Sequence, residues 1–369
     1  MHIHGGDIYT YQGMLDFSAN INPLGIPSSV VKAAAQGAAQ AASYPDTQCR
    51  ELRRALAEQE SRGLPQPIRP EQLICGNGAA DLIFALALAQ KPRQALLLAP
   101  GFHEYEQALR AIDCQIQYHY LTEQDGFALN VSRLAAELTP ATELLFLCNP
   151  NNPTGLALTR QQLRPLLESC RKCGTLLVLD ECFNEFLDEP AAYTLKPLLA
   201  EFPNLFILKA FTKLYAMPGL RLGYGISADA GLLARLAEVS QPWRVSTPAQ
   251  LAGLAALQEQ EYVRQAQALV RQERQFLCHE LSALGLKVYN SLANYIFFQS
   301  PDGWSAEFDL AAACRERQIL IRDCSNYVGL QPGFYRIAVR TRPENEKLLQ
   351  ALRQIVRHMQ QGRDANEPA

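Results

Sequence analysis

The sequence lacks both long hydrophobic runs and an excess of charge of one sign. The apolar stretch Leu82–Ala89 is far shorter than the roughly 20 residues that cross a bilayer, and no basic segment followed by an apolar one opens the chain. Net charge is −3, from 34 Lys and Arg against 37 Asp and Glu, without a long basic run. These absences argue against membrane insertion and nucleic-acid binding. We expect a cytoplasmic protein that acts on a small molecule.

Cysteine is too sparse for a disulfide scaffold, with 10 residues scattered through 369. We therefore expect reduced thiols. Cys170 and Cys173 have the spacing of a redox site or of half a zinc site, but no second cysteine pair or nearby histidine completes a zinc ligand set. We interpret both as structural thiols on a helix, and we expect no metal.

The remaining pattern is that of an α/β protein of about two domains. Short apolar runs alternate with helical patterns, and apolar runs of this kind are typical of strands buried on both faces of a mainly parallel sheet. The expected strands are Leu73–Cys75, Ala95–Ala99, Gln115–Tyr120, Leu144–Cys148, Thr175–Leu179, Leu205–Lys209 and Leu222–Ile226. Helices between them include Asp81–Gln90, Glu104–Ala111 and Gln161–Lys172.

A second alternation follows and indicates a smaller α+β domain. It begins with one long helical stretch, Pro248–Leu284, and the polar tail from Gln361 is expected to fray. We divide the chain into an N-terminal arm (1–30), a large domain (31–243) and a small domain (244–369). The expected strands of the small domain are Leu286–Tyr289, Tyr295–Phe298, Leu320–Arg322 and Tyr335–Val339, with helices at Ala306–Arg317 and Glu344–Gln360.

Polar and glycine residues follow several of the expected strands, where ligands gather in open α/β sheets. The turn Gly76-Asn77-Gly78 opens a helix, so it is either an anion site or an ordinary loop. Asp180 either pairs with a protonated ring nitrogen or caps a helix. Asn152 is either a hydrogen-bond donor to a ligand or part of a proline-flanked turn, and Phe102 either stacks on a flat ring or belongs to the core.

Lys213 completes a possible pyridoxal-phosphate site. It lies in the segment Ala210 to Tyr224, AFTKLYAMPGLRLGY, where a lysine with a lowered pKa could form a Schiff base. Arg221 and the hydroxyl of Thr212 would bind the cofactor phosphate. Each residue alone has an ordinary structural explanation, but together they describe one complete site.

These segments resemble the fold-type I pyridoxal-phosphate family, within the branch that holds histidinol-phosphate aminotransferases and threonine-phosphate decarboxylases. The resemblance covers nearly the whole chain. It implies that Lys213 carries the cofactor, with Asp180 at its ring nitrogen, Asn152 at its phenolic oxygen, Phe102 against its ring, and Gly78, Ala79, Ala80, Thr212 and Arg221 around its phosphate. It also implies that Tyr44 reaches the phosphate of a neighbouring subunit, hence a homodimer.

The N-terminal segments His4–Ile8 and Asp16–Gly25 look like the decarboxylases, as do Gln241–Trp243 and Ile321–Leu330. Phe183 stands where the aminotransferases usually carry a tyrosine. The chain departs from the family pattern at Ala79, Ala80 and Ala210, which leaves fewer side-chain donors for the cofactor phosphate and more reliance on backbone N–H groups.

The resemblance implies decarboxylation of L-threonine O-3-phosphate to (R)-1-amino-2-propanol O-2-phosphate, in cobalamin biosynthesis. Arg336 would clamp the substrate carboxylate, and Arg322, His4 and Asn20 would surround its phosphate, unless both arginines are surface ion-pair residues. L-Serine O-phosphate is an open alternative substrate, because one methyl group gives only ~1–3 kcal/mol of discrimination.

Two other functions compete with decarboxylation. One is histidinol-phosphate amino transfer, in which Lys213 would move a proton from the substrate to the cofactor. The other is a non-catalytic regulator with a DNA-binding module, which 369 residues leave little room to include.

Overall fold

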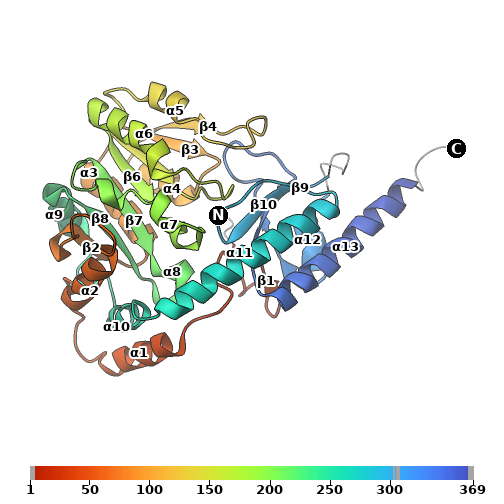
Figure 1. Ribbon diagram of the computed structural model, residues 1–369, viewed down its shortest axis with the longest axis horizontal. Helices are drawn as coiled ribbons and strands as arrows, with labels where there is room; N and C mark the ends of the chain where they lie inside the picture. Colours follow the sequence, from red (N-terminus) through yellow and green to blue (C-terminus); the bar gives the residue numbers. More distant parts are fainter. Residues whose placement is uncertain (1–4, 302–303, 305–307, 365–369) are drawn as a thin grey trace.

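The computed structural model describes residues 5–301, 304 and 308–364 (Figure 1). Its main feature is a seven-stranded sheet with the order β2-β8-β7-β6-β5-β3-β4. Only β8 runs opposite to the other six strands, so the sheet is mainly parallel, as predicted. All seven strands lie within one residue of the predicted bounds: β2 (Leu73–Gly76), β3 (Gln94–Ala99), β4 (Gln115–Tyr120), β5 (Leu144–Cys148), β6 (Leu176–Asp180), β7 (Leu205–Ala210) and β8 (Gly223–Ser227).

Both faces of this sheet are buried, because alternate residues of each strand enter different hydrophobic clusters. In β5, Leu145 and Leu147 belong to one cluster, whereas Leu144 and Phe146 belong to the other. Helices supply many of the other members of both clusters, as expected for βαβ units. They include α2 (Arg50–Glu60), α3 (Ala79–Gln90), α4 (His103–Arg110), α5 (Val131–Glu137), α6 (Arg160–Cys173) and α9 (Ala230–Val239).

A second sheet lies beside the first, toward the C-terminal end of the chain (Figure 1). It has the order β12-β13-β10-β9 and is antiparallel, with strands β9 (Lys287–Val288), β10 (Tyr295–Gln299), β12 (Arg322–Asp323) and β13 (Phe334–Ala338). A third cluster joins it to α11 (Gln260–Ala283), α12 (Leu310–Arg315) and α13 (Arg342–Asp364). The domain limits at residues 30 and 243 stay a prediction.

The structure corrects the predicted strand Leu320–Arg322. Two short strands replace it: β11 (Ile319–Leu320) pairs with β1 (Leu15–Asp16), and Arg322 begins β12 in the second sheet. The N-terminal arm causes this split, because β1 takes the hydrogen-bonding edge of β11 in a separate two-stranded sheet. The predicted helix Ala306–Arg317 is likewise shorter in the described chain, as α12, whose N-cap Asp309 accepts from Ala312 N at 2.9 Å.

The predicted long helix Pro248–Leu284 is two helices, α10 (Thr247–Ala256) and α11. The helical conformation is interrupted at residues 257–259. This interruption lets α10 pack on α1 (Ser28–Ala39) while α11 crosses to the second sheet (Figure 1). The tail also differs from prediction, since α13 remains helical to Asp364. Short helical segments fill the loops: α7 (Pro190–Tyr193), α8 (Phe211–Leu214) and 3-10 turns at Pro70–Gln72, Asn184–Phe186, Lys196–Leu198 and Pro218–Leu220.

All ten cysteines are free thiols, as predicted, and Cys170 and Cys173 lie on α6. Among the described residues no helix is long and apolar enough to cross a membrane.

Candidate active site

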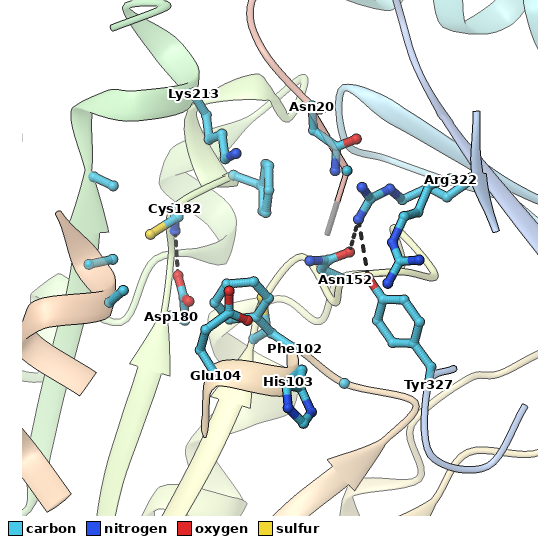
Figure 2. Close-up of a pocket in the computed structure, with 18 of the residues that line it drawn as sticks. Asn20, Phe102, His103, Glu104, Asn152, Asp180, Cys182, Lys213, Arg322 and Tyr327 are labelled. Atoms are coloured by element: carbon cyan, nitrogen blue, oxygen red, sulfur yellow. Dashed lines mark hydrogen bonds between the residues drawn. The ribbon is translucent and has the colours of Figure 1, made fainter. Parts of the chain in front are cut away.

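A cavity of about 280 Å³ opens where the carboxyl ends of β5, β6 and β7 meet the second sheet (Figure 2). It brings together most of the predicted site residues: Asn20, Ala79, Ala80, Phe102, Asn152, Asp180, Thr212, Lys213, Arg221, Arg322 and Arg336. His4 lies outside the described residues. Tyr44 does not line this pocket; it is 79% exposed and stacks on Trp243 with ring centroids 4.3 Å apart.

Lys213 lies on α8, the short helix that directly follows β7. The N-terminal arm holds this helix, because Asn22 donates from its backbone N to Lys213 O at 3.1 Å and from Nδ2 to Leu214 O at 2.6 Å. Burial, together with the charges of Arg336 and Arg221, lowers the pKa of Lys213 to about 8. The neutral fraction of this amine near physiological pH is therefore far greater than that of an ordinary lysine, and a nucleophilic lysine must be neutral.

Asp180 is the buried last residue of β6, and it caps no helix of the described chain. Burial raises the pKa of Asp180, while hydrogen bonds from Cys182 and Tyr105 and the charge of Lys213 oppose that rise. Tyr105 Oη donates to Oδ2 at 2.6 Å, and Cys182 N donates to Oδ1 at 2.9 Å. These two bonds fix the carboxylate at the bottom of the pocket.

Gly78 and Arg221 form a cradle for an anion at the N-terminus of α3. Gly78 is the N-cap residue with φ of 82°, and a Cβ on it would lie 2.5 Å from Arg221 Nη2. Only glycine lets the guanidinium approach so closely. Ala79, Ala80 and Thr212 add small side chains, so the N–H groups and dipole of the helix face the cavity directly.

Arg336 reaches the pocket from β13 of the second sheet and is only 5% exposed. Its Nη1 donates to Asn152 Oδ1, and its Nη2 donates to Ser18 O at 2.8 Å. The amide oxygen of Asn152 is thus occupied, which leaves the Asn152 N–H groups as donors to a ligand. The alternative that Arg336 is a surface ion-pair residue is wrong.

Arg322 is also buried, at 8% exposed, so it is no surface residue either. Its Nη2 donates to Asn326 Oδ1 at 2.8 Å, and its guanidinium lies 5.1 Å from the centre of the Tyr327 ring. Asn20, 2% exposed, points into the same part of the pocket (Figure 2). Its Oδ1 has no hydrogen-bond partner within the described chain, as expected of a group that waits for a ligand.

Sequence reasoning missed several residues that line or support the pocket: Ser18, Glu104, Tyr105, Cys182, Asn326 and Tyr327. Glu104 and Tyr105 directly follow Phe102, and Asn326 and Tyr327 lie in a segment already matched to the decarboxylases. Their position beside predicted site residues was the available signal, but it does not tell which way each side chain points.

A family model described as aminotransferase class I and II matches residues 12–352. The chain belongs to this family. It is 38% identical to the threonine-phosphate decarboxylase of Salmonella typhimurium, with 96% of each chain covered. It is 33% identical to the histidinol-phosphate aminotransferase of Anaeromyxobacter sp., with 94% of this chain and 92% of the relative covered.

Solved structures agree with this assignment. The histidinol-phosphate aminotransferase of Clostridium acetobutylicum matches with a TM-score of 0.85 at 26% identity, covering 94% of this chain and 100% of that one. The L-threonine-O-3-phosphate decarboxylase of Porphyromonas gingivalis matches with a TM-score of 0.79 at 25% identity, covering 93% and 100%. The predicted fold type and the predicted resemblance are both confirmed.

Pyridoxal phosphate is the cofactor of this family, and the pocket fits it. The fit rests on a partly neutral lysine amine, a buried carboxylate, a glycine cradle beside an arginine, and an aromatic ring, all in one cavity.

Proposed function

We propose that this chain is a pyridoxal-phosphate-dependent decarboxylase that converts L-threonine O-3-phosphate to (R)-1-amino-2-propanol O-2-phosphate. The observation that carries this proposal is the pair of buried arginines, Arg322 and Arg336, in one pocket. An O-phospho amino acid has two anionic groups, and each needs a buried cation as its partner. The greater identity to a threonine-phosphate decarboxylase than to the histidinol-phosphate aminotransferases supports the same choice.

The geometry of the pocket supports a set of cofactor-binding roles. Lys213 would bind the cofactor aldehyde, and Asp180 would hold the proton on its ring nitrogen. Gly78, Ala79, Ala80, Thr212 and Arg221 would hold its phosphate, Asn152 would donate to its phenolic oxygen, and Phe102 would pack against its ring. When bound, pyridoxal phosphate supplies a sink for the electron pair released at the substrate Cα.

The substrate-binding roles decide which bond breaks. Arg336 would grip the carboxylate, and its contacts with Asn152 and Ser18 fix the direction of that grip. Arg322 would bind the substrate phosphate with His4 and Asn20. Two fixed anion sites restrict rotation about Cα, so the bond to the carboxylate can be held in the orientation that favours its cleavage.

A homodimer in the cytoplasm, serving cobalamin biosynthesis, completes the proposal. Tyr44 and Trp243 form a stacked aromatic pair, 79% and 44% exposed, away from the pocket of their own chain. Exposed aromatic residues are enriched at protein interfaces. We place this pair at the subunit interface, with Tyr44 directed to the cofactor phosphate of the partner.

The experiment that tests the substrate compares L-threonine O-phosphate with unphosphorylated L-threonine, in the wild type and in Arg322→Gln. We expect Arg322→Gln to raise KM for the phosphorylated substrate ~10-fold to 100-fold, in line with loss of a charged hydrogen bond. The same substitution should leave the poor turnover of L-threonine unchanged. Equal turnover of both substrates by the wild type would contradict the proposal.

Histidinol-phosphate amino transfer is the second candidate, because the solved aminotransferase matches this fold with a TM-score of 0.85. Turnover of histidinol phosphate that depends on 2-oxoglutarate would establish it. Release of carbon dioxide from L-serine O-phosphate in the same assays would rank that substrate against L-threonine O-phosphate.

A further inference from the structure

Glu104 is a second carboxyl group in the pocket, and the roles described so far do not use it. It is the second residue of α4, two residues after Phe102, and it lines the cavity together with Asp180, Lys213 and Arg322. Figure 2 shows its carboxyl on the same side of the pocket as Phe102 and Asp180. Its Oε2 is shielded from solvent.

The placement of Glu104 is unusual for a glutamate in the first turn of a helix. Such residues normally stay ionised, because the N-terminal end of the helix dipole favours negative charge. The other glutamate of this turn, Glu106, forms an ion pair with Arg110 at 2.6 Å. Both glutamates line the cavity, but Glu104 is the one whose surroundings include Lys213 and Arg322.

Some of the groups around Glu104 raise the pKa of its carboxyl, and others lower it. Burial raises the pKa of Glu104 to about 7, with Asp180 adding to the rise, while Lys213 and Arg322 oppose it. Burial raises the pKa of Tyr327, and the charge of Glu104 adds a small part to that rise. Bound cofactor and substrate would bring further negative charge and favour the neutral carboxyl still more. The loaded pocket would therefore hold an un-ionised carboxylic acid beside the catalytic lysine.

Decarboxylation requires a proton donor, whereas amino transfer only moves a proton within the site. The bond from Cα to the carboxylate carbon breaks, carbon dioxide leaves, and the electron pair remains on the Cα side. A new C–H bond then forms at Cα, so each turnover consumes one proton. A carboxyl group that is neutral near pH 7 can give this proton and recover another from solvent.

We propose that Glu104 is a further catalytic residue, which donates the proton to Cα after carbon dioxide has left. The inference rests on the proposed decarboxylase function. In the donation step Glu104 becomes a carboxylate, which Lys213 and Arg322 stabilise, and the amine product leaves before solvent reprotonates the carboxylate. Lys213 then needs only to exchange with the substrate amine.

The test uses cofactor-loaded wild type, Glu104→Gln, Glu104→Asp and a control, Glu51→Gln. Glu51 is the second residue of α2 and exposed, so its substitution removes a carboxylate from the same helix position without touching the pocket. We expect Glu104→Gln to form the amine product ~10²-fold more slowly, the size of a general-acid effect. Glu104→Asp should recover part of the rate, and Glu51→Gln should match the wild type.

A second readout separates proton donation from mere packing. In a single turnover, Glu104→Gln should still release carbon dioxide at close to the wild-type rate, since bond cleavage precedes the step that it lacks. A share of its turnovers should then end in pyridoxamine phosphate and an aldehyde, because protonation would occur on the cofactor instead of at Cα and water would then cleave the bond from the nitrogen to the substrate carbon. Infrared titration of the cofactor-free wild type should show a protonated carboxyl band that disappears as pH rises through about 7 and is absent from Glu104→Gln.

Two results would overturn the inference. One is a Glu104→Gln enzyme that forms the amine at the wild-type rate without pyridoxamine phosphate. The other is an infrared titration in which the wild type and Glu104→Gln are identical. Failure of the proposed function itself looks different, because the wild type would then release no carbon dioxide from L-threonine O-phosphate.

Discussion

The hydrogen bond from Tyr105 to Asp180 gives the sharpest prediction about cofactor binding. Tyr105 Oη lies 2.6 Å from Asp180 Oδ2, both residues are 4% exposed, and Tyr105 does not line the pocket. Its ring also contacts that of Phe102, with centroids 5.4 Å apart. Tyr105→Phe keeps this ring contact, so the substitution acts on the cofactor through Asp180. A hydrogen bond to a charged group contributes roughly 1.5–3 kcal/mol. If that contribution acts on the ionised Asp180 of the loaded enzyme, Tyr105→Phe weakens cofactor binding ~10-fold to 100-fold.

A matched control distinguishes this effect from general destabilisation. Tyr224 Oη donates to the buried carboxylate of Glu60 at the same distance, 2.6 Å, outside the active-site pocket. Both Tyr105→Phe and Tyr224→Phe should lower the unfolding temperature by comparable amounts, because each removes one charged hydrogen bond. Only Tyr105→Phe should weaken cofactor binding, measured by titrating cofactor-free protein with pyridoxal phosphate and following its visible absorption.

The pH dependence follows from the sign of the Asp180 shift. Burial already raises the pKa of Asp180, and loss of the Tyr105 hydroxyl raises it further. The defect in cofactor binding should therefore grow as pH falls. Equal cofactor affinity of Tyr105→Phe and the wild type at every pH would refute a role for this bond in holding Asp180.

Three further predictions concern other charged groups. Cofactor capture by the cofactor-free protein should accelerate as pH rises through about 8, where the Lys213 amine becomes neutral, as measured by stopped-flow absorbance. Arg336→Lys should raise KM for L-threonine O-phosphate ~10-fold or more in steady-state assays, because lysine cannot replace a bidentate guanidinium. Burial raises the pKa of Glu60, but the charges of Lys209 and Lys196 outweigh burial and lower the pKa to about 2. Glu60→Gln should therefore lower the free energy of unfolding by roughly 3–5 kcal/mol near neutral pH. Chemical denaturation measures this difference, which should become smaller as the pH falls below the usual pKa of glutamate.

The sequence predicted the large sheet well because its strands carry a simple signal. Runs such as Leu144–Cys148 are apolar throughout, and burial on both faces requires that pattern. The order of the strands and the reversed direction of β8 are set by tertiary contacts, and local sequence does not encode them. Two-residue strands such as β11 and β12 lie below the length at which periodicity can be recognised.

The candidate site shows the same division between local and tertiary information. Residues that directly follow strands, such as Asp180 and Lys213, were found because the chain position alone places them at the sheet edge. Glu104 and Tyr105 were missed because their roles depend on burial and on partners distant in sequence. Asp180, for example, lies 75 residues from Tyr105. The proposed role of Tyr44 still depends on a partner subunit.

The most direct test of the central claim is carbon dioxide release from L-threonine O-phosphate by the cofactor-loaded protein in the absence of any keto acid. We predict release by the wild type, with none from Lys213→Ala under the same conditions. No release by the wild type, together with 2-oxoglutarate-dependent turnover of histidinol phosphate, would contradict the decarboxylase assignment.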